Sequence, residues 1–164
     1  MPGREDTYHW ALLVGPKVEP EKGLGQGIRF HAREKINVSD SPNGFVWGYD
    51  EESIELSPTG MLLCRVIIGK VEDIDRLRSI FQRTPIRADT PGWNCVEWVK
   101  EAVESAMQDG KALAACAESW SKVRDAAMWY VEKKKADHRF DGTKVYNYNR
   151  AATWDLLENS EKTP

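Results

Sequence analysis

The sequence has few of the residues that thiol, metal and redox chemistry use, with three cysteines and three histidines among 164 residues. An odd number of widely spaced cysteines argues against a disulfide framework and against a Cys-x-x-Cys zinc site. We therefore expect reduced thiols, no metal and no cofactor. The three cysteines are Cys64, Cys95 and Cys116.

Long apolar runs and an excess of positive charge are also missing. No apolar run approaches the roughly 20 residues that cross a bilayer, and residues 1–6 lack the basic-then-apolar pattern of a signal peptide. The formal net charge is -3, from 26 acidic and 23 basic residues, and these are mixed along the chain, which offers no broad basic face to phosphates. A soluble cytoplasmic protein is expected, with a small-molecule or peptide substrate as partner, and with no nucleic acid and no membrane span.

The length and the 41% hydrophobic content suit one domain with one core, over residues 1–164. Alternating and apolar stretches in the first half predict four strands in one antiparallel sheet. Helical spacing of apolar residues in the second half predicts three helices. The strands are expected at 8–14, 28–34, 45–49 and 61–68, and the helices at 73–82, 95–109 and 118–135.

Strands followed by helices indicate an α+β fold, in which a small antiparallel sheet packs on the helix that carries Cys95. The core is expected over about 8–110, and 111–164 would add the last helix and an aromatic, polar tail.

Cys95 stands where thiol chemistry is favoured, directly after a residue that can cap a helix, Asn94. The helix dipole and the unpaired N–H groups of a first turn stabilise a thiolate, and the same amides can hold an oxyanion. His9 opens the first predicted strand and His31 lies near the end of the second. Adjacent strands would bring both rings to one sheet edge, with His9 as the base for Cys95 and His31 orienting His9.

Three fragments carry a resemblance to a known superfamily: His9–Gly15 (HWALLVG), Phe30–Ala32 (FHA) and Asn94–Val99 (NCVEWV). Together they resemble the His…His…Asn-Cys pattern of the circularly permuted, papain-like NlpC/P60 superfamily, nearest the lecithin:retinol acyltransferase-like branch. The chain also looks like small uncharacterised fungal proteins with an HWALLVGPK motif. The resemblance implies a permuted papain-like fold and a catalytic set of Cys95, His9 and His31.

The resemblance covers about residues 8–106, and two features depart from it. The acyltransferase-like proteins usually carry a hydrophobic membrane segment after their core, and this sequence has none. The chain from Lys111 onward matches nothing in the superfamily. The implied activity is therefore that of a hydrolase or acyl/amide transferase that forms a thioester on Cys95, with a peptide or small-molecule amide or ester as substrate.

Other residues have simpler interpretations or lesser roles. Tyr8, Trp93 and Asn94 flank the proposed catalytic residues and are candidates for the substrate pocket. Cys64 and Cys116 have apolar neighbours and are expected to be packing residues. Two other functions stay open at this stage. One is a ligand- or partner-binding module with an unused catalytic set, and the other is a zinc site formed by His9, His31 and Cys95.

Overall fold

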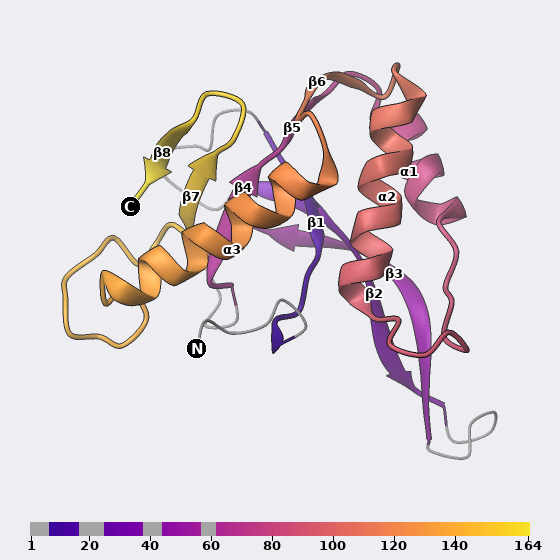
Figure 1. Ribbon diagram of the computed structural model, residues 1–164, viewed down its shortest axis with the longest axis horizontal. Coiled ribbons are helices and arrows are strands. Elements are labelled where there is room, and N and C mark those ends of the chain that lie inside the picture. The colour runs from indigo at the N-terminus through magenta and orange to yellow at the C-terminus, as the bar shows by residue number, and fades with distance from the viewer. Residues whose placement is uncertain (1–6, 17–24, 38–43, 57–61) are drawn as a thin grey trace. The chain divides into compact units, whose positions relative to one another are not determined.

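A computed structural model describes residues 7–16, 25–37, 44–56 and 62–164 (Figure 1). These residues form a mixed α+β structure of helices and small sheets, which confirms the predicted class. They divide into two compact units, one within Gly3–Leu56 and Glu72–Ala112, and the other within Ser57–Val71 and Leu113–Pro164. We call these the thiol unit and the C-terminal unit. The single domain expected from the chain length stays a prediction.

The thiol unit contains an antiparallel sheet in the order β1 (Leu12–Val14), β2 (Gln26–Ile36) and β3 (Phe45–Glu55). Residues directly opposite in such a pair share a face of the sheet. In β2 and β3, His31 lies opposite Asp50 and Arg29 lies opposite Glu52. One face of this hairpin is therefore polar, and the other carries the fully buried ring of Phe30.

The apolar face belongs to the core of the thiol unit, which includes α1 (Ile74–Arg83) and α2 (Cys95–Asp109). Helix α2 contacts β2, and α1 contacts α2. The Phe30 ring lies 5.1 Å from that of Phe81 on α1, and Trp98 on α2 is completely buried. Edge-on aromatic contacts of this kind add to the stabilisation from apolar burial. Together with the contact between α2 and β2, they hold both helices against the sheet.

Local capping signals set both ends of α2. The Asn94 side chain accepts a hydrogen bond from the Val96 N–H at 2.9 Å, as an N-cap should. Gly110 ends the helix at φ 68°, a left-handed conformation that is cheap for glycine. The sequence prediction for this helix is confirmed at both ends.

The C-terminal unit corrects the prediction of one four-stranded sheet. β4 (Cys64–Ile67) pairs in parallel with β7 (Ala152–Asp155), and β7 pairs antiparallel with β8 (Ser160–Thr163). The prediction placed β4 beside the first three strands, and it was wrong because β4 has its partner about 90 residues further along the chain. Residue Met61, the predicted start of that strand, lies outside the described residues.

The rest of the C-terminal unit includes a short pair of strands that are distant in sequence and the third predicted helix. β5 (Gly69–Val71) pairs antiparallel with β6 (Leu113–Cys116). α3 (Trp120–Ala136) begins at a Ser119 cap and contacts β4. Among the described residues, no helix combines the length and apolar character that a membrane crossing needs.

Candidate thiol site

Cys95 is the first residue of α2, and its sulfur lies against the backbone on both sides of His9. The Trp10 N–H donates to Cys95 Sγ at 3.5 Å, and the Cys95 thiol faces the Tyr8 carbonyl oxygen at 3.9 Å. Cys95 is 7% exposed, so this contact is largely shielded from water. The fold thus brings together a cysteine and a histidine segment that are about 85 residues apart.

Burial and hydrogen bonding act in opposite directions on the Cys95 thiol. Burial raises its pKa above the ordinary value for cysteine, and hydrogen bonds from the N–H groups of Trp10, Cys95 and Val96 offset only part of that effect. The resting thiol is therefore protonated at neutral pH. The expectation that the helix start alone would favour the thiolate gave too little weight to burial.

The two predicted histidines lie side by side. His9 Nε2 is 2.7 Å from His31 Nδ1, a hydrogen-bond distance, and the rings meet edge-on at 70°. His9 is exposed just before β1, whereas His31 on β2 is 3% exposed. This hydrogen bond gives the His9 ring a fixed neighbour on one side, which is what an orienting residue provides.

Both imidazoles are neutral at pH 7. Burial, then the charge of Arg29 and the nearby His9, lower the pKa of His31 to about 4, although Asp50 opposes the shift. Desolvation of the ring by neighbouring protein atoms also lowers the pKa of His9, with a contribution from Arg29 and then from Arg33. A neutral thiol on Cys95 and neutral imidazoles on His9 and His31 are the resting state that these effects favour.

Asp50 is a member of this cluster that the sequence analysis did not identify. Its Oδ2 lies 3.7 Å from His31 Nε2, on the side of the ring away from His9. The predicted third strand ended at Tyr49, whereas β3 continues to Glu55 and places Asp50 opposite His31. A signal was present in the spacing, since the acids at 50 and 52 and the bases at 29 and 33 are each an even number of residues apart, which places each pair on one face of a strand.

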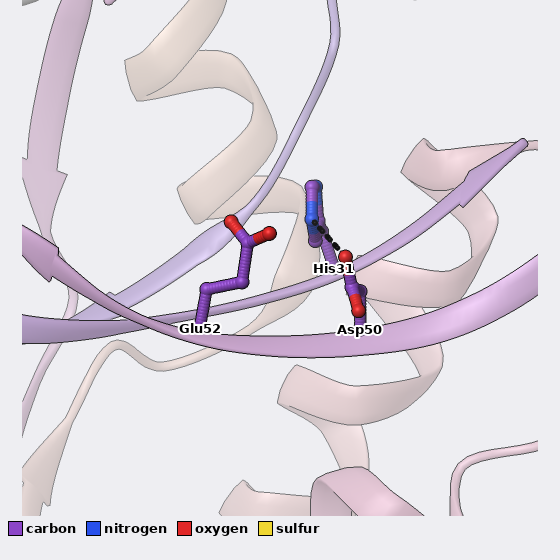
Figure 2. A group of neighbouring side chains, drawn as sticks. All are labelled: His31, Asp50 and Glu52. Carbon is purple, nitrogen blue, oxygen red and sulfur yellow. Dashed lines mark ion pairs between the residues drawn. The ribbon is translucent and has the colours of Figure 1, made fainter. Parts of the chain in front are cut away.

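His31, Asp50 and Glu52 also form a group that could hold a metal ion. One ring nitrogen and one oxygen from each carboxylate lie within 4.8 Å of one another (Figure 2). Both carboxylates are already paired with cations. Glu52 accepts from Arg29, and Asp50 accepts from Arg33 at 2.5 Å and from Lys35 at 3.0 Å. Three positive side chains therefore accompany two carboxylates, and a divalent cation would have to displace them.

The three residues proposed for the substrate pocket, Tyr8, Trp93 and Asn94, all make structural contacts within the thiol unit. The Asn94 side chain caps α2, and Tyr8 presents its carbonyl oxygen to Cys95. Trp93 is 9% exposed and packs edge-on against Trp47 with ring centres 5.4 Å apart.

The other two cysteines lie in the C-terminal unit. Burial raises the pKa of Cys64 to about 11, and Cys116 is exposed. Both are free thiols and serve as internal references for the reactivity of Cys95.

Comparisons with known proteins identify a family, but they do not identify a function. No curated protein and no solved structure matches the chain. One family model, described as a family of unknown function (DUF6914), matches residues 1–163. Because that match spans almost the entire sequence, the chain belongs to the DUF6914 family.

Proposed function

We propose that this protein is a cysteine hydrolase or acyl/amide transferase with a permuted papain-like fold, which forms a thioester on Cys95. The observation that carries the proposal is the position of the Cys95 sulfur. It lies at the start of a buried helix, against the backbone on both sides of His9, whose ring is hydrogen-bonded to His31. A nucleophile, a base beside it and a group that orients the base are the parts that such chemistry requires.

The proposed reaction begins with proton transfer from the Cys95 thiol to His9. The sulfur then attacks the carbonyl carbon of an amide or ester, and the negative charge that develops on the carbonyl oxygen is stabilised by the Cys95 N–H. The bond to the leaving group breaks as His9 returns the proton to that group. Water or a second nucleophile then attacks the thioester and frees the thiol.

The neutral resting state gives this mechanism a particular form. Because the pKa of Cys95 is raised and that of His9 is lowered, the proton leaves the sulfur as the substrate is attacked, and not before. His9 thus works as a general base. In the absence of substrate, the protonated Cys95 thiol reacts slowly with simple alkylating agents.

The permuted papain-like fold is supported by the order and packing of the elements. His9 and β2, which carries His31, precede α2 in the chain, and α2 packs on a small antiparallel sheet. A peptide or a small-molecule amide or ester is the substrate class that this chemistry takes.

An activated ester tests the proposal directly. The protein is mixed with p-nitrophenyl acetate, release of p-nitrophenolate is followed by absorbance, and the acetylated residue is located by mass spectrometry. We expect a burst with the acetyl group on Cys95 as a hydroxylamine-sensitive thioester. Cys95→Ala removes the burst, whereas the matched control Cys116→Ala keeps it. Acetylation of Cys116 alone, with Cys95 unmodified across pH 6 to 9, would contradict the enzyme proposal.

The neutral thiol also favours one alternative, a ligand- or partner-binding module in which the same residues are not catalytic. A raised pKa for Cys95 is what a buried structural cysteine shows. This alternative predicts that Cys95 reacts with the ester no faster than Cys64, and that Cys95→Ser leaves the burst unchanged.

A further inference from the structure

His31 has one ring nitrogen that no neighbour satisfies. Its Nδ1 faces His9, while its Nε2 is buried and has no hydrogen-bond partner. Buried polar atoms are nearly always paired, and an exception calls for a reason. The Asp50 carboxylate lies just beyond hydrogen-bond range, with Oδ2 3.7 Å from that nitrogen. A shift of less than 1 Å would close this gap.

The hydrogen bond between the two rings limits where their protons can be. A neutral imidazole carries one N–H and one acceptor nitrogen. Because His9 Nε2 is joined to His31 Nδ1, His9 has its Nδ1 left to accept a proton from Cys95. His9 must then hold its own proton on Nε2, and His31 must accept at Nδ1. The proton of His31 is thereby placed on Nε2, the nitrogen that faces Asp50.

We propose that Asp50 is the positioning residue of the thiol site, which fixes the Nε2–H tautomer of His31 and, through it, the base-competent tautomer of His9. The assignment rests on the proposed function for its catalytic meaning. The tautomers themselves are a property of the resting protein. As His9 takes the thiol proton, the N–H of His31 polarises towards Asp50 and the gap closes to a hydrogen bond.

The neighbouring cations keep the Asp50 carboxylate ionised, so that it can accept a hydrogen bond. They also disfavour positive charge on the two histidine rings, which Asp50 must offset. Burial works to raise the pKa of Asp50, but hydrogen bonds from Lys35 and Arg33 outweigh it and lower the pKa below its usual value. Arg29 pairs with Glu52, and both Arg29 and Arg33 oppose positive charge on the two rings. Asp50 is the group that favours a proton on the His31 ring.

Nitrogen-15 NMR of the imidazole rings tests the assignment without any substrate. In the wild-type protein at pH 7.5, we expect His31 with its proton on Nε2 and His9 also with its proton on Nε2. In Asp50→Asn, whose amide can present a donor to the ring, we expect His31 to move towards the Nδ1–H tautomer. The burst rate with p-nitrophenyl acetate should fall by about 10²-fold, since an incorrect tautomer disables a histidine base.

Two variants separate positioning from folding. Glu51→Gln makes the same chemical change one residue along, where the carboxylate accepts from Arg78 at 2.7 Å, and it should leave both tautomers unchanged. Asp50→Glu retains a carboxylate and should restore the wild-type His31 tautomer. If Asp50→Asn does not fold, the wild-type spectrum alone decides, because a proton on His31 Nδ1 overturns the proposal.

The outcomes distinguish this inference from the proposed function. If the tautomers are as expected and the wild-type protein shows no burst, the proposed function fails while the assignment to Asp50 stands. If the burst occurs and Asp50→Asn changes neither tautomer nor rate, the assignment fails alone. If one equivalent of Zn²⁺ shifts the His31 nitrogens, and both Asp50→Asn and Glu52→Gln abolish that shift, the cluster is a metal site and the positioning role is overturned.

Discussion

Two buried ionisable side chains, one in each unit, differ in how completely their polar atoms are paired. Lys134 in the C-terminal unit is 2% exposed, and its Nζ lies 2.5 Å from Glu161, which also accepts from the Tyr130 hydroxyl at 3.0 Å. His31 in the thiol unit is 3% exposed and keeps one ring nitrogen without a hydrogen bond.

This difference in pairing distinguishes a structural cluster, around Lys134, from a candidate functional site, around His31. The Lys134 cluster ties the end of α3 to β8, since Tyr130 also donates to the Thr163 carbonyl at 2.9 Å. The charges of Lys134 and Glu161 are paired with each other, which indicates a structural role. His31 instead lies between a second histidine and a carboxylate that is slightly too far away. A buried group left incompletely paired is a place to look for function.

The largest expected effect concerns His9, the proposed base of the thiol site. His9→Ala removes the proton acceptor, and we expect the burst rate with p-nitrophenyl acetate to fall by about 10²- to 10⁴-fold. Stopped-flow absorbance measures that rate. His138→Ala is the matched control, because His138 is an exposed histidine that pairs with Asp141 in the C-terminal unit. Equal rates for His9→Ala and the wild-type protein would remove His9 from the mechanism.

Lys134→Ala probes the structural side of the comparison. It leaves Glu161 without its buried cation, and removing one partner of a buried ion pair costs about 3–5 kcal/mol of unfolding free energy. Urea unfolding followed by circular dichroism gives the value. Lys135→Ala removes an exposed lysine that pairs with Glu132 at 3.0 Å, and should cost less than about 1 kcal/mol. Equal losses for the two variants would mean that the Lys134 cluster is not structural.

The depressed pKa of His31 predicts how stability changes with acid. The unfolded chain takes up this proton near pH 6.5, while the folded ring does so only near pH 4. The contribution of His31 to folding stability is therefore fully present above about pH 6.5 and is lost as the pH falls from 6.5 to 4, by on the order of 3 kcal/mol. Urea midpoints across this range measure the loss. His31→Leu should flatten that part of the profile, and an unchanged profile would contradict the assigned pKa.

The smallest expected effect is that of the helix cap next to Cys95. Asn94→Ala removes the acceptor for the Val96 N–H and should cost about 1 kcal/mol of unfolding free energy. Asn94→Asp keeps an acceptor and serves as the matched control. If Asn94→Ala loses the Cys95 burst while its stability is unchanged, Asn94 contributes to the substrate pocket that the sequence suggested, and not only to the cap.

Local signals explain why the helices were predictable. Asn94 and Gly110 bound α2, and both act on backbone groups within a few residues of themselves. The alternation of β2 was visible for the same reason. β3 was predicted six residues too short, because the acidic run from Asp50 has low strand propensity and is held in the sheet by cross-strand pairs with the β2 arginines.

Long-range pairing was beyond sequence reasoning in both units. Nothing near β4 indicates that its neighbour is β7 and that the pair is parallel. The same limit hid Asp50, whose role depends on the register between two strands that only pairing in space defines.

By itself, the sequence determined the cap before Cys95 and the α+β class, and it pointed to Cys95, His9 and His31 as candidate site residues, because these inferences depend on residue types and short spacings. The tertiary structure decided that the Cys95 sulfur lies against the backbone of the His9 segment and that Asp50 stands behind His31. It also decided the protonation state, since desolvation of a thiol and an imidazole depends on what the fold packs around them.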